Sequence, residues 1–198
     1  MKETMYIGSG DVAALLAGRE TKAHTALMRR FVSGEKPYYN AKASPIDALR
    51  TGAILEDRYF LVLPEGWYPQ YVVESSEMDV FRCSLDFARI EKGKVVEFEE
   101  LKTCSFDDFL LISEKGVDFK KPVYGKYFNQ IQEQLYCTGL DWASLVFLAV
   151  YSYDDAENYN REILENEYVK FCVERDENTI ALIKERGMIF QQIKDCYR

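Results

Sequence analysis

Residues 80–103, VFRCSLDFARIEKGKVVEFEELKT, indicate two β-strands joined by a tight turn. Apolar and polar residues alternate over 80–90 and again over 94–103, which is the period of a half-buried strand. Between them, Glu91-Lys92-Gly93 has the composition of a short hairpin turn. The sequence therefore predicts a β-hairpin in the middle of the chain.

Charged residues interrupt the apolar positions of the second predicted strand. Alternation groups every other residue on one face: Val96, Phe98, Glu100 and Lys102. The other face then holds Val95, Glu97, Glu99 and Leu101. A carboxylate and an ammonium on a packing face are costly to desolvate unless they are paired or bind a cation. Glu100 and Lys102 thus mark either a functional site or a strand end that emerges into solvent with a salt bridge.

The first predicted strand carries a second acidic candidate, Asp86. Alternation places one apolar set together: Phe81, Cys83, Leu85 and Phe87. Asp86 falls on the opposite face between the small residues Ser84 and Ala88, which leave room beside its carboxylate. Antiparallel pairing would bring Asp86 close to Glu100. The alternative is a solvated aspartate on an outward face.

Two predicted helices add further polar candidates. Ser44-Pro45 is typical of a helix start, and in the helix over 45–60 Glu56 lies on an apolar stripe with Leu49, Ala53 and Phe60. In the helix over 124–139, one face is predicted to hold Phe128, Gln132, Leu135, Tyr136 and Gly139. Gln132 and Tyr136 are neighbours there at i and i+4. Glu56 could also be a tolerated edge residue, and Gln132 with Tyr136 a hydrogen-bonded core pair.

The remaining pattern completes one α/β domain over residues 1–198 with a mixed central sheet flanked by helices. The other predicted helices cover 12–17, 21–32, 106–112 and 176–196. The other predicted strands cover 71–74, 142–151 and 168–173.

Composition excludes several classes of protein. Lys and Arg number 25 against 33 Asp and Glu, so the formal net charge is −8. That charge argues against binding nucleic acid by bulk positive charge, although a local basic groove is compatible with it. Apolar runs are too short for a transmembrane helix, and the first residues lack the apolar stretch of a signal peptide. We therefore expect a cytoplasmic protein with no membrane association.

Cysteine and histidine usage constrains any metal site. The cysteines are Cys83, Cys104, Cys137, Cys172 and Cys196, an odd count without a CxxC spacing. This indicates reduced thiols and argues against a zinc ribbon or an iron–sulfur cluster. The single histidine, His24, is expected to pack or to lie at the surface. We therefore expect metal to be held by carboxylates, which favours Mg²⁺ or Mn²⁺.

The three inward carboxylates and the lysine could form one site. Glu56, Asp86 and Glu100 could hold one or two divalent ions, which would polarise a phosphodiester and lower the pKa of a water. Lys102 could orient that water or stabilise the charge that develops in the transition state.

The pattern Asp86…Glu100-Leu101-Lys102 resembles the D…(D/E)xK signature of the restriction-endonuclease-like, or PD-(D/E)XK, nuclease superfamily. Residues 51–56, TGAILE, look like the helix that supplies an upstream metal-binding Glu in bacteriophage lambda exonuclease and the YqaJ-type viral recombinases. Residues 127–136 are similar to the Q-rich helix of that family and end in its QxxxY spacing. Residues 7–12 look like its first helix start, and the resemblance follows nearly the whole chain in order.

The resemblance implies roles for particular residues. The expected metal ligands are Glu56, Asp86, Glu100 and the carbonyl of Leu101, and the expected catalytic residues add Lys102, Gln132 and Tyr136. The expected DNA-binding residues are Ser9, Arg29, Arg30, Lys115, Lys120, Lys121 and Lys126. The cofactor would be Mg²⁺ or Mn²⁺. An iron–sulfur cluster is not expected, because the branch of the superfamily that carries one has four cysteines arranged around it.

The resemblance also implies an activity. It predicts a DNA exonuclease that degrades linear duplexes from the 5′ end and leaves a 3′ single strand for an annealing protein during phage-type recombination. Family members form rings of three around DNA, so a homotrimer is implied. Two departures are the absence of an arginine before Ile7, which leaves 5′-phosphate capture to Ser9, Arg29 or Arg30, and Leu85 in place of a proline. The alternatives are an endonuclease or structure-specific nuclease of the same fold, and a catalytically silent DNA- or protein-binding module.

Overall fold

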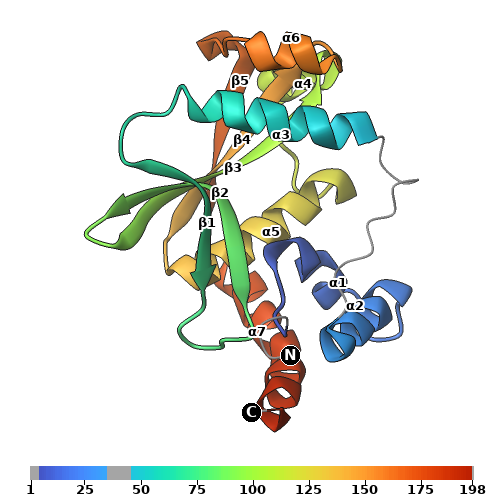
Figure 1. The fold of residues 1–198 in the computed structure, drawn as a ribbon. Helices are drawn as coiled ribbons and strands as arrows, with labels where there is room; N and C mark the ends of the chain where they lie inside the picture. The colour runs from blue at the N-terminus through green and yellow to red at the C-terminus, as the bar shows by residue number, and fades with distance from the viewer. Residues whose placement is uncertain (1–4, 35–45, 198) are drawn as a thin grey trace.

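A five-stranded mixed sheet forms the centre of the molecule in the computed structural model, which describes residues 5–34 and 46–197 (Figure 1). The strands are β1 (Trp67–Glu74), β2 (Arg82–Glu91), β3 (Lys94–Ser105), β4 (Trp142–Val150) and β5 (Tyr168–Glu174). They lie in the order β1-β2-β3-β4-β5, with β3 and β4 parallel and the other neighbours antiparallel. The predicted mixed sheet and α/β class are confirmed.

Helices cover the sheet on both faces. They are α1 (Val12–Leu16), α2 (Lys22–Ser33), α3 (Ile46–Phe60), α4 (Phe106–Lys115), α5 (Pro122–Thr138), α6 (Asp155–Asn160) and α7 (Glu177–Cys196). Short 3₁₀ turns precede α1 (Ser9–Asp11) and β5 (Glu165–Glu167). The sequence predicted all the helices except α6, which is short and has no apolar period from which it could be recognised. Within the described residues, no helix is both long enough and apolar enough to cross a membrane.

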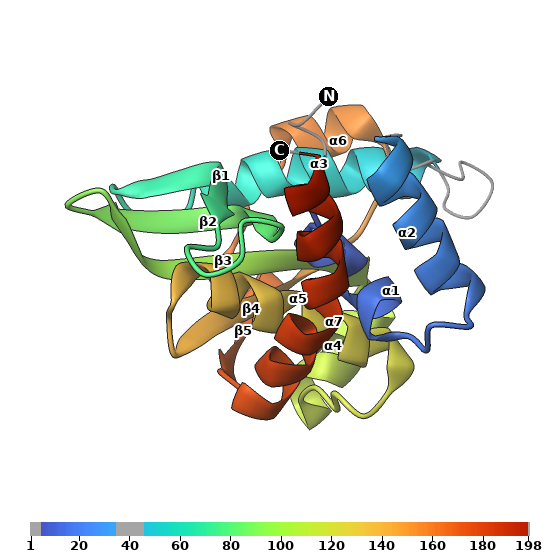
Figure 2. The same cartoon turned by 90° about the horizontal axis from the view of Figure 1, so that it is seen from below.

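Three apolar clusters connect these layers. One lies between the sheet and α4 and α5 and includes Leu85, Phe98 and Ile131. A second packs α3 on the opposite face through Leu55 and Tyr59. A third joins α1, α2 and α7 beyond one end of the sheet, and Figure 2 shows α7 running past that end beside α5. The described residues thus pack around one sheet, and a single domain over 1–198 stays a prediction.

The hairpin between β2 and β3 has the predicted turn but contains an irregularity. Lys92 and Gly93 have φ angles of 51° and 76°, which are left-handed turn conformations. The pairing register then shifts by one residue, so that β3 contains an extra residue. As a result Val95 packs with Phe98 against the α5 face, and the predicted grouping of Val96 with Phe98 is wrong.

The regular alternation of side chains along β2 is interrupted at Asp86. Leu85 packs on the α5 side, whereas Phe87 packs on the α3 side, so the predicted common face for these two residues is wrong. The β2–β3 ladder ends at the pair Phe87↔Glu99. One residue further along, the Asp86 carboxylate accepts the backbone N–H of Leu101 at 2.8 Å. The side chain thus replaces a backbone acceptor where the two strands separate.

Helix α3 ends at Phe60 as predicted but buries a different stripe. Leu49 is 42% exposed and Ala53 is exposed, whereas Leu55 and Tyr59 are fully buried. The sequence offers two apolar stripes of similar strength, and only packing against β3 chooses between them. Ser44 and Pro45, the predicted start, lie outside the described residues.

The histidine has one of its two expected roles, while the reduced state of the cysteines stays a prediction. His24 is buried, and its ring lies edge-on to Phe190 at 5.9 Å between centroids, so it is a packing residue. All the cysteines are free. The fold contains no disulfide among the described residues.

Gly187 of α7 lies where the packing leaves no room for a side chain. A Cβ atom at this position would lie 2.3 Å from Cζ of Phe81, a buried ring at the end of the sheet. Helix propensity alone would make Gly187→Ala stabilising, but this overlap reverses the sign. We expect a loss of about 1–3 kcal/mol in the free energy of unfolding, measured by urea denaturation. Gly10→Ala, where a Cβ meets no atom within 4 Å, is the control. Equal midpoints for both variants would contradict this packing.

Candidate active site

Glu100 is the centre of a polar cluster inside the fold. Its side chain is 1% exposed, yet both carboxylate oxygens accept hydrogen bonds. Oε1 accepts Nε2 of Gln130 at 2.5 Å and also Nζ of Lys102, while Oε2 accepts Nε2 of Gln134 at 2.6 Å. The two glutamines lie one turn apart on α5. Hydrogen bonds to both oxygens hold the buried Glu100 carboxylate in one orientation.

Two further carboxylates face Glu100 from different elements. Asp86 comes from β2, one residue beyond the last β2–β3 pair, and Glu56 comes from α3. Burial and the charge of Glu100 raise the pKa of Asp86 well above its usual range. Burial also raises the pKa of Glu56, against a hydrogen bond from Gln70, and the charge of Glu100 adds to the rise. Burial and repulsion by Glu100 thus both disfavour the charged forms of Asp86 and Glu56.

Packing on both sides of Glu56 positions it over β3. Gly52, one turn earlier in α3, faces β3, where a Cβ would be in ordinary van der Waals contact with Oγ1 of Thr103 at 3.6 Å. Tyr59, three residues after Glu56, donates its hydroxyl to Oε2 of the buried Glu99 at 2.7 Å. Lys170 of β5 pairs with the same carboxylate at 2.5 Å. The Tyr59–Glu99–Lys170 contact therefore fastens α3 to the strand that carries Glu100.

Lys102 supplies the positive charge of the cluster. Its ammonium pairs with Glu100 and lies 5.4 Å from the ring centroid of Tyr127. Burial alone would lower the pKa of Lys102, but the charges of Glu100 and Asp86 outweigh it and raise that pKa. The side chain is therefore a fixed ammonium at neutral pH.

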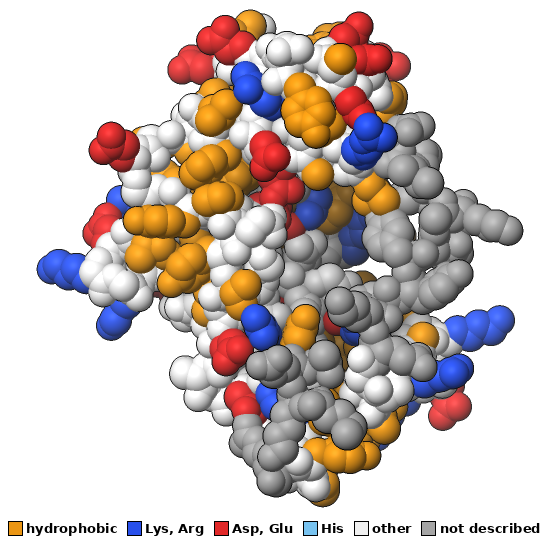
Figure 3. Space-filling view, in the orientation of Figure 1, with side chains coloured by type: hydrophobic (Ala, Val, Ile, Leu, Met, Phe, Trp, Pro, Cys, Tyr) orange, Lys and Arg blue, Asp and Glu red, His pale blue; other side chains and the backbone are white. Residues whose placement is uncertain are grey.

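The donor set fits a hard divalent cation. Glu56, Asp86 and Glu100 offer carboxylate oxygens, the ligands that Mg²⁺ and Mn²⁺ prefer. Burial is the main cause of the raised pKa values of Asp86 and Glu56, and repulsion by the charge of Glu100 adds to both. A cation among them would remove that repulsion. Figure 3 shows acidic and basic side chains together in a hollow near the middle of the molecule.

Gln132 and Tyr136 do not face this cluster, so that expectation is wrong. Gln132 is fully buried and bridges the end of β5, donating to the carbonyl of Glu174 at 2.9 Å and accepting the N–H of Asp176 at 2.7 Å. Tyr136 packs edge-on to Phe81 at the far end of the sheet. Two positions along a helix rotate a side chain by about 200° around the helix axis. Gln132 therefore points away from the side of α5 on which Gln130 and Gln134 contact Glu100.

The residues that the sequence reasoning missed are Gln130 and Gln134. They have the same i, i+4 spacing as Gln132 and Tyr136, and both lie in the segment already recognised as Q-rich. Gln70 was also missed. Its backbone has a φ of 49°, and its amide reaches from β1 to Glu56 and accepts Oγ of Ser84 at 3.1 Å. No local pattern marked it, because its role depends on where β1 passes the hairpin.

The predicted DNA-binding residues occupy different environments. Ser9 is only 8% exposed, and the guanidinium of Arg30 pairs with Asp11, whose carboxylate also accepts the N–H of Gly8 at 3.1 Å. Lys126 is exposed and lies 4.7 Å from the centroid of the same Tyr127 ring that Lys102 contacts. The remaining cations are exposed: Arg29, Lys115, Lys120 and Lys121. Their role in binding DNA stays a prediction.

Two glutamine variants should distinguish a residue that supports metal binding from one that only stabilises the fold. Gln134→Leu removes a donor from Glu100 and should weaken binding of a divalent ion by about 10–100-fold while the protein stays folded. Gln132→Leu removes two part-buried hydrogen bonds to backbone groups and should lower the free energy of unfolding by roughly 1–3 kcal/mol in total. Calorimetric Mn²⁺ titration and urea denaturation measure the two effects. Reversed behaviour of the variants would contradict the assignment.

Comparison with known proteins identifies the fold. No family model and no curated protein matches the chain. Among solved structures, an alkaline exonuclease from Laribacter hongkongensis superposes with a TM-score of 0.68 at 18% identity, covering 98% of this chain and 90% of that one. A phage-related exonuclease from Haemophilus somnus 129PT gives 0.61 at 14% identity, covering 98% and 95%. The chain thus has the restriction-endonuclease-like fold that the sequence predicted, and the suspected resemblance is confirmed at the level of fold.

Proposed function

We propose that this chain is a metal-dependent deoxyribonuclease acting on linear duplex DNA as an exonuclease. The observation that carries the proposal is that Glu56, Asp86, Glu100 and Lys102 interact electrostatically with one another near the point where β2 separates from β3. The fold similarity to two exonucleases supports it independently of these residues.

The carboxylates, the lysine and the glutamines would have different roles in the reaction. Glu56, Asp86 and Glu100, with the backbone of Leu101 beside Asp86, would hold one or two Mg²⁺ or Mn²⁺ ions. Such an ion supplies Lewis acidity toward a phosphodiester and a water of lowered pKa. Lys102 would donate hydrogen bonds to the attacking water or to the charge that develops on the phosphorus oxygens. Gln130 and Gln134 would keep Glu100 in one orientation throughout.

The finer points of the function rest on the family resemblance. They are 5′-to-3′ polarity, production of 3′ single strands for an annealing protein, and a homotrimer around DNA. The net charge of −8 is compatible with an outer surface that repels DNA around an inner channel that attracts it. Lys126 is the first residue to test in such a channel, because it contacts the Tyr127 ring that Lys102 also contacts.

Matched DNA substrates test the proposed function. With Mg²⁺ or Mn²⁺, we expect a linear duplex to disappear while a covalently closed circle of the same sequence stays intact. Separate 5′ and 3′ end labels then report the polarity, since early release of the 5′ label is the expected result. Opening of the circle would favour an endonuclease. Intact linear and circular DNA would favour the binding module and overturn the nuclease proposal.

A further inference from the structure

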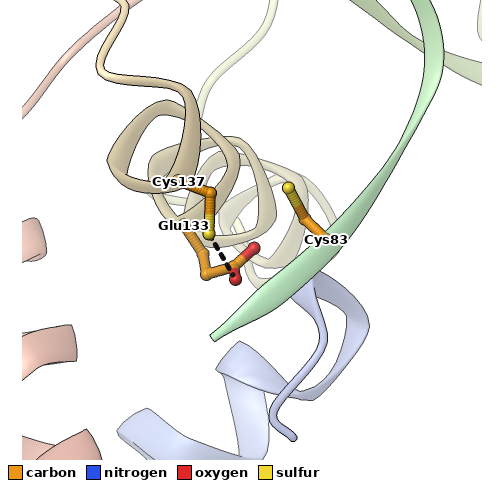
Figure 4. A group of neighbouring side chains, drawn as sticks. All are labelled: Cys83, Glu133 and Cys137. Carbon is orange, nitrogen blue, oxygen red and sulfur yellow. Dashed lines mark hydrogen bonds between the residues drawn. The ribbon is translucent and has the colours of Figure 1, made fainter. Parts of the chain in front are cut away.

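A second cluster of metal-ligating side chains lies inside the fold, away from the carboxylates described above. It consists of Cys83 on β2 with Glu133 and Cys137 on α5 (Figure 4). Glu133 and Cys137 are at i and i+4, so they share one face of the helix. The figure shows the three side chains converging in the space between helix and strand.

The distances in this cluster suit a small tetrahedral ion. One ligand atom of each residue lies within 4.8 Å of the other two, and Sγ of Cys137 is 3.2 Å from Oε1 of Glu133. Ligand atoms around tetrahedral Zn²⁺ are about 3.6–3.8 Å apart, given Zn–S and Zn–O bonds of about 2.3 and 2.1 Å. Small side-chain rotations would therefore bring all three into one coordination shell. All three ligating side chains are buried, so an ion held there would be shielded from solvent.

One carboxylate oxygen of Glu133 has no hydrogen-bond partner, which favours a cation beside it. Glu133 is fully buried, and its Oε2 has no hydrogen-bond partner among the described residues. Burial raises its pKa to about 8, and the charges of Asp11 and Glu100 act in the same direction. A buried, unpartnered carboxylate oxygen calls for an ion or a proton. Two adjacent thiols decide which ion, because thiolates prefer zinc-like metals to Mg²⁺ or Ca²⁺.

We propose that Cys83, Glu133 and Cys137 bind one thiolate-preferring divalent ion of the Zn²⁺ class as a structural clamp between β2 and α5. The thiol protons and any proton on Glu133 pass to solvent as the ion enters, and a water or the second Glu133 oxygen completes the shell. The clamp would join the two elements that position the carboxylate cluster, since Cys83 precedes Asp86 by three residues and Glu133 precedes Gln134. Binding would stabilise the folded state without requiring nuclease activity.

Cobalt spectroscopy on the full-length, reduced protein tests this site. Ca²⁺ in excess first occupies oxygen-ligand sites, and Co²⁺ is then titrated as the probe. We expect a thiolate-to-cobalt charge-transfer band that saturates at one equivalent. Cys83→Ser and Cys137→Ser should each reduce the band at least tenfold, whereas Cys172→Ser, at an exposed thiol, should leave it unchanged. Glu133→Gln should keep a band but weaken Co²⁺ binding at least tenfold.

Thermal unfolding supplies a readout independent of the spectrum. Zn²⁺ at about a hundredfold excess over its Kd should raise the Tm of the wild-type protein by roughly 5–10 °C. Cys83→Ser, once shown to be folded by circular dichroism, should lose that rise. A folded wild-type protein without the band, a band insensitive to Cys83 and Cys137, or a Cys83–Cys137 disulfide formed in place of ion uptake would overturn the proposal.

Discussion

Asp86→Asn is expected to reduce DNA cleavage by on the order of a thousandfold or more while leaving the metal-free protein at least as stable as the wild type. Asn keeps an oxygen that can accept the N–H of Leu101 but lacks the charge needed to hold a divalent ion. Initial rates on an end-labelled linear duplex measure the first effect. Thermal unfolding in EDTA measures the second.

The pH dependence of this stability difference has a definite sign. The folded-state pKa of Asp86 is raised, so the folded protein binds a proton more tightly than the unfolded chain does. The wild-type protein therefore loses stability as pH rises from the ordinary aspartate pKa, about 3.9, through the raised value. The Asn variant lacks this loss, so its advantage in EDTA should grow with pH and vanish in acid. A Tm that falls in the variant would show instead that Asp86 has a structural role.

Lys102→Ala is expected to remove most cleavage, by roughly a hundredfold or more, with divalent-ion and DNA affinities largely retained. The reason is that Lys102 would act on the charge that develops in the transition state, while Glu100 keeps its bonds from Gln130 and Gln134. Single-turnover cleavage at saturating enzyme separates this chemical step from binding.

The matched control for Lys102 is Lys94→Ala. Lys94 lies on the same strand but at its exposed end, beside the hairpin turn. It should cleave at the wild-type rate, so that any loss in Lys102→Ala is specific to the inward ammonium. Wild-type turnover in Lys102→Ala would show that this lysine is only an ion-pair partner for Glu100.

Local sequence was sufficient to predict most of the elements and to bring Asp86 and Glu100 together. The alternation in 80–103 predicted the hairpin, and the antiparallel pairing of its strands placed Asp86 beside Glu100. Helix boundaries at Gly34 and Gly139 also followed from sequence, because both take the left-handed conformation that ends a helix. These features depend on neighbours in the chain, whose geometry is nearly independent of the rest of the fold.

The details that failed were those in which two local readings had similar strength. The sequence predicts that α3 buries Leu49, whereas the structure buries Leu55. It also predicts that Gln132 faces the site, whereas Gln134 is the residue that contacts Glu100. In each case the helix itself was predicted, but its rotation about its own axis was not. A helix with polar and apolar residues all round has no preferred rotation until another surface packs against it.

The sequence by itself thus predicted the α/β class, all the described helices except α6, and the four charged candidates Glu56, Asp86, Glu100 and Lys102. Only the tertiary structure decided that Gln130, Gln134 and Gln70 surround them and that Cys83 meets Glu133 and Cys137. Periodicity records which residues share a face of one element. Contacts between elements depend instead on the crossing of α3 and α5 over the sheet and on the bulge and strand separation in the hairpin. Those follow from packing free energy summed over the whole core, which no local pattern contains.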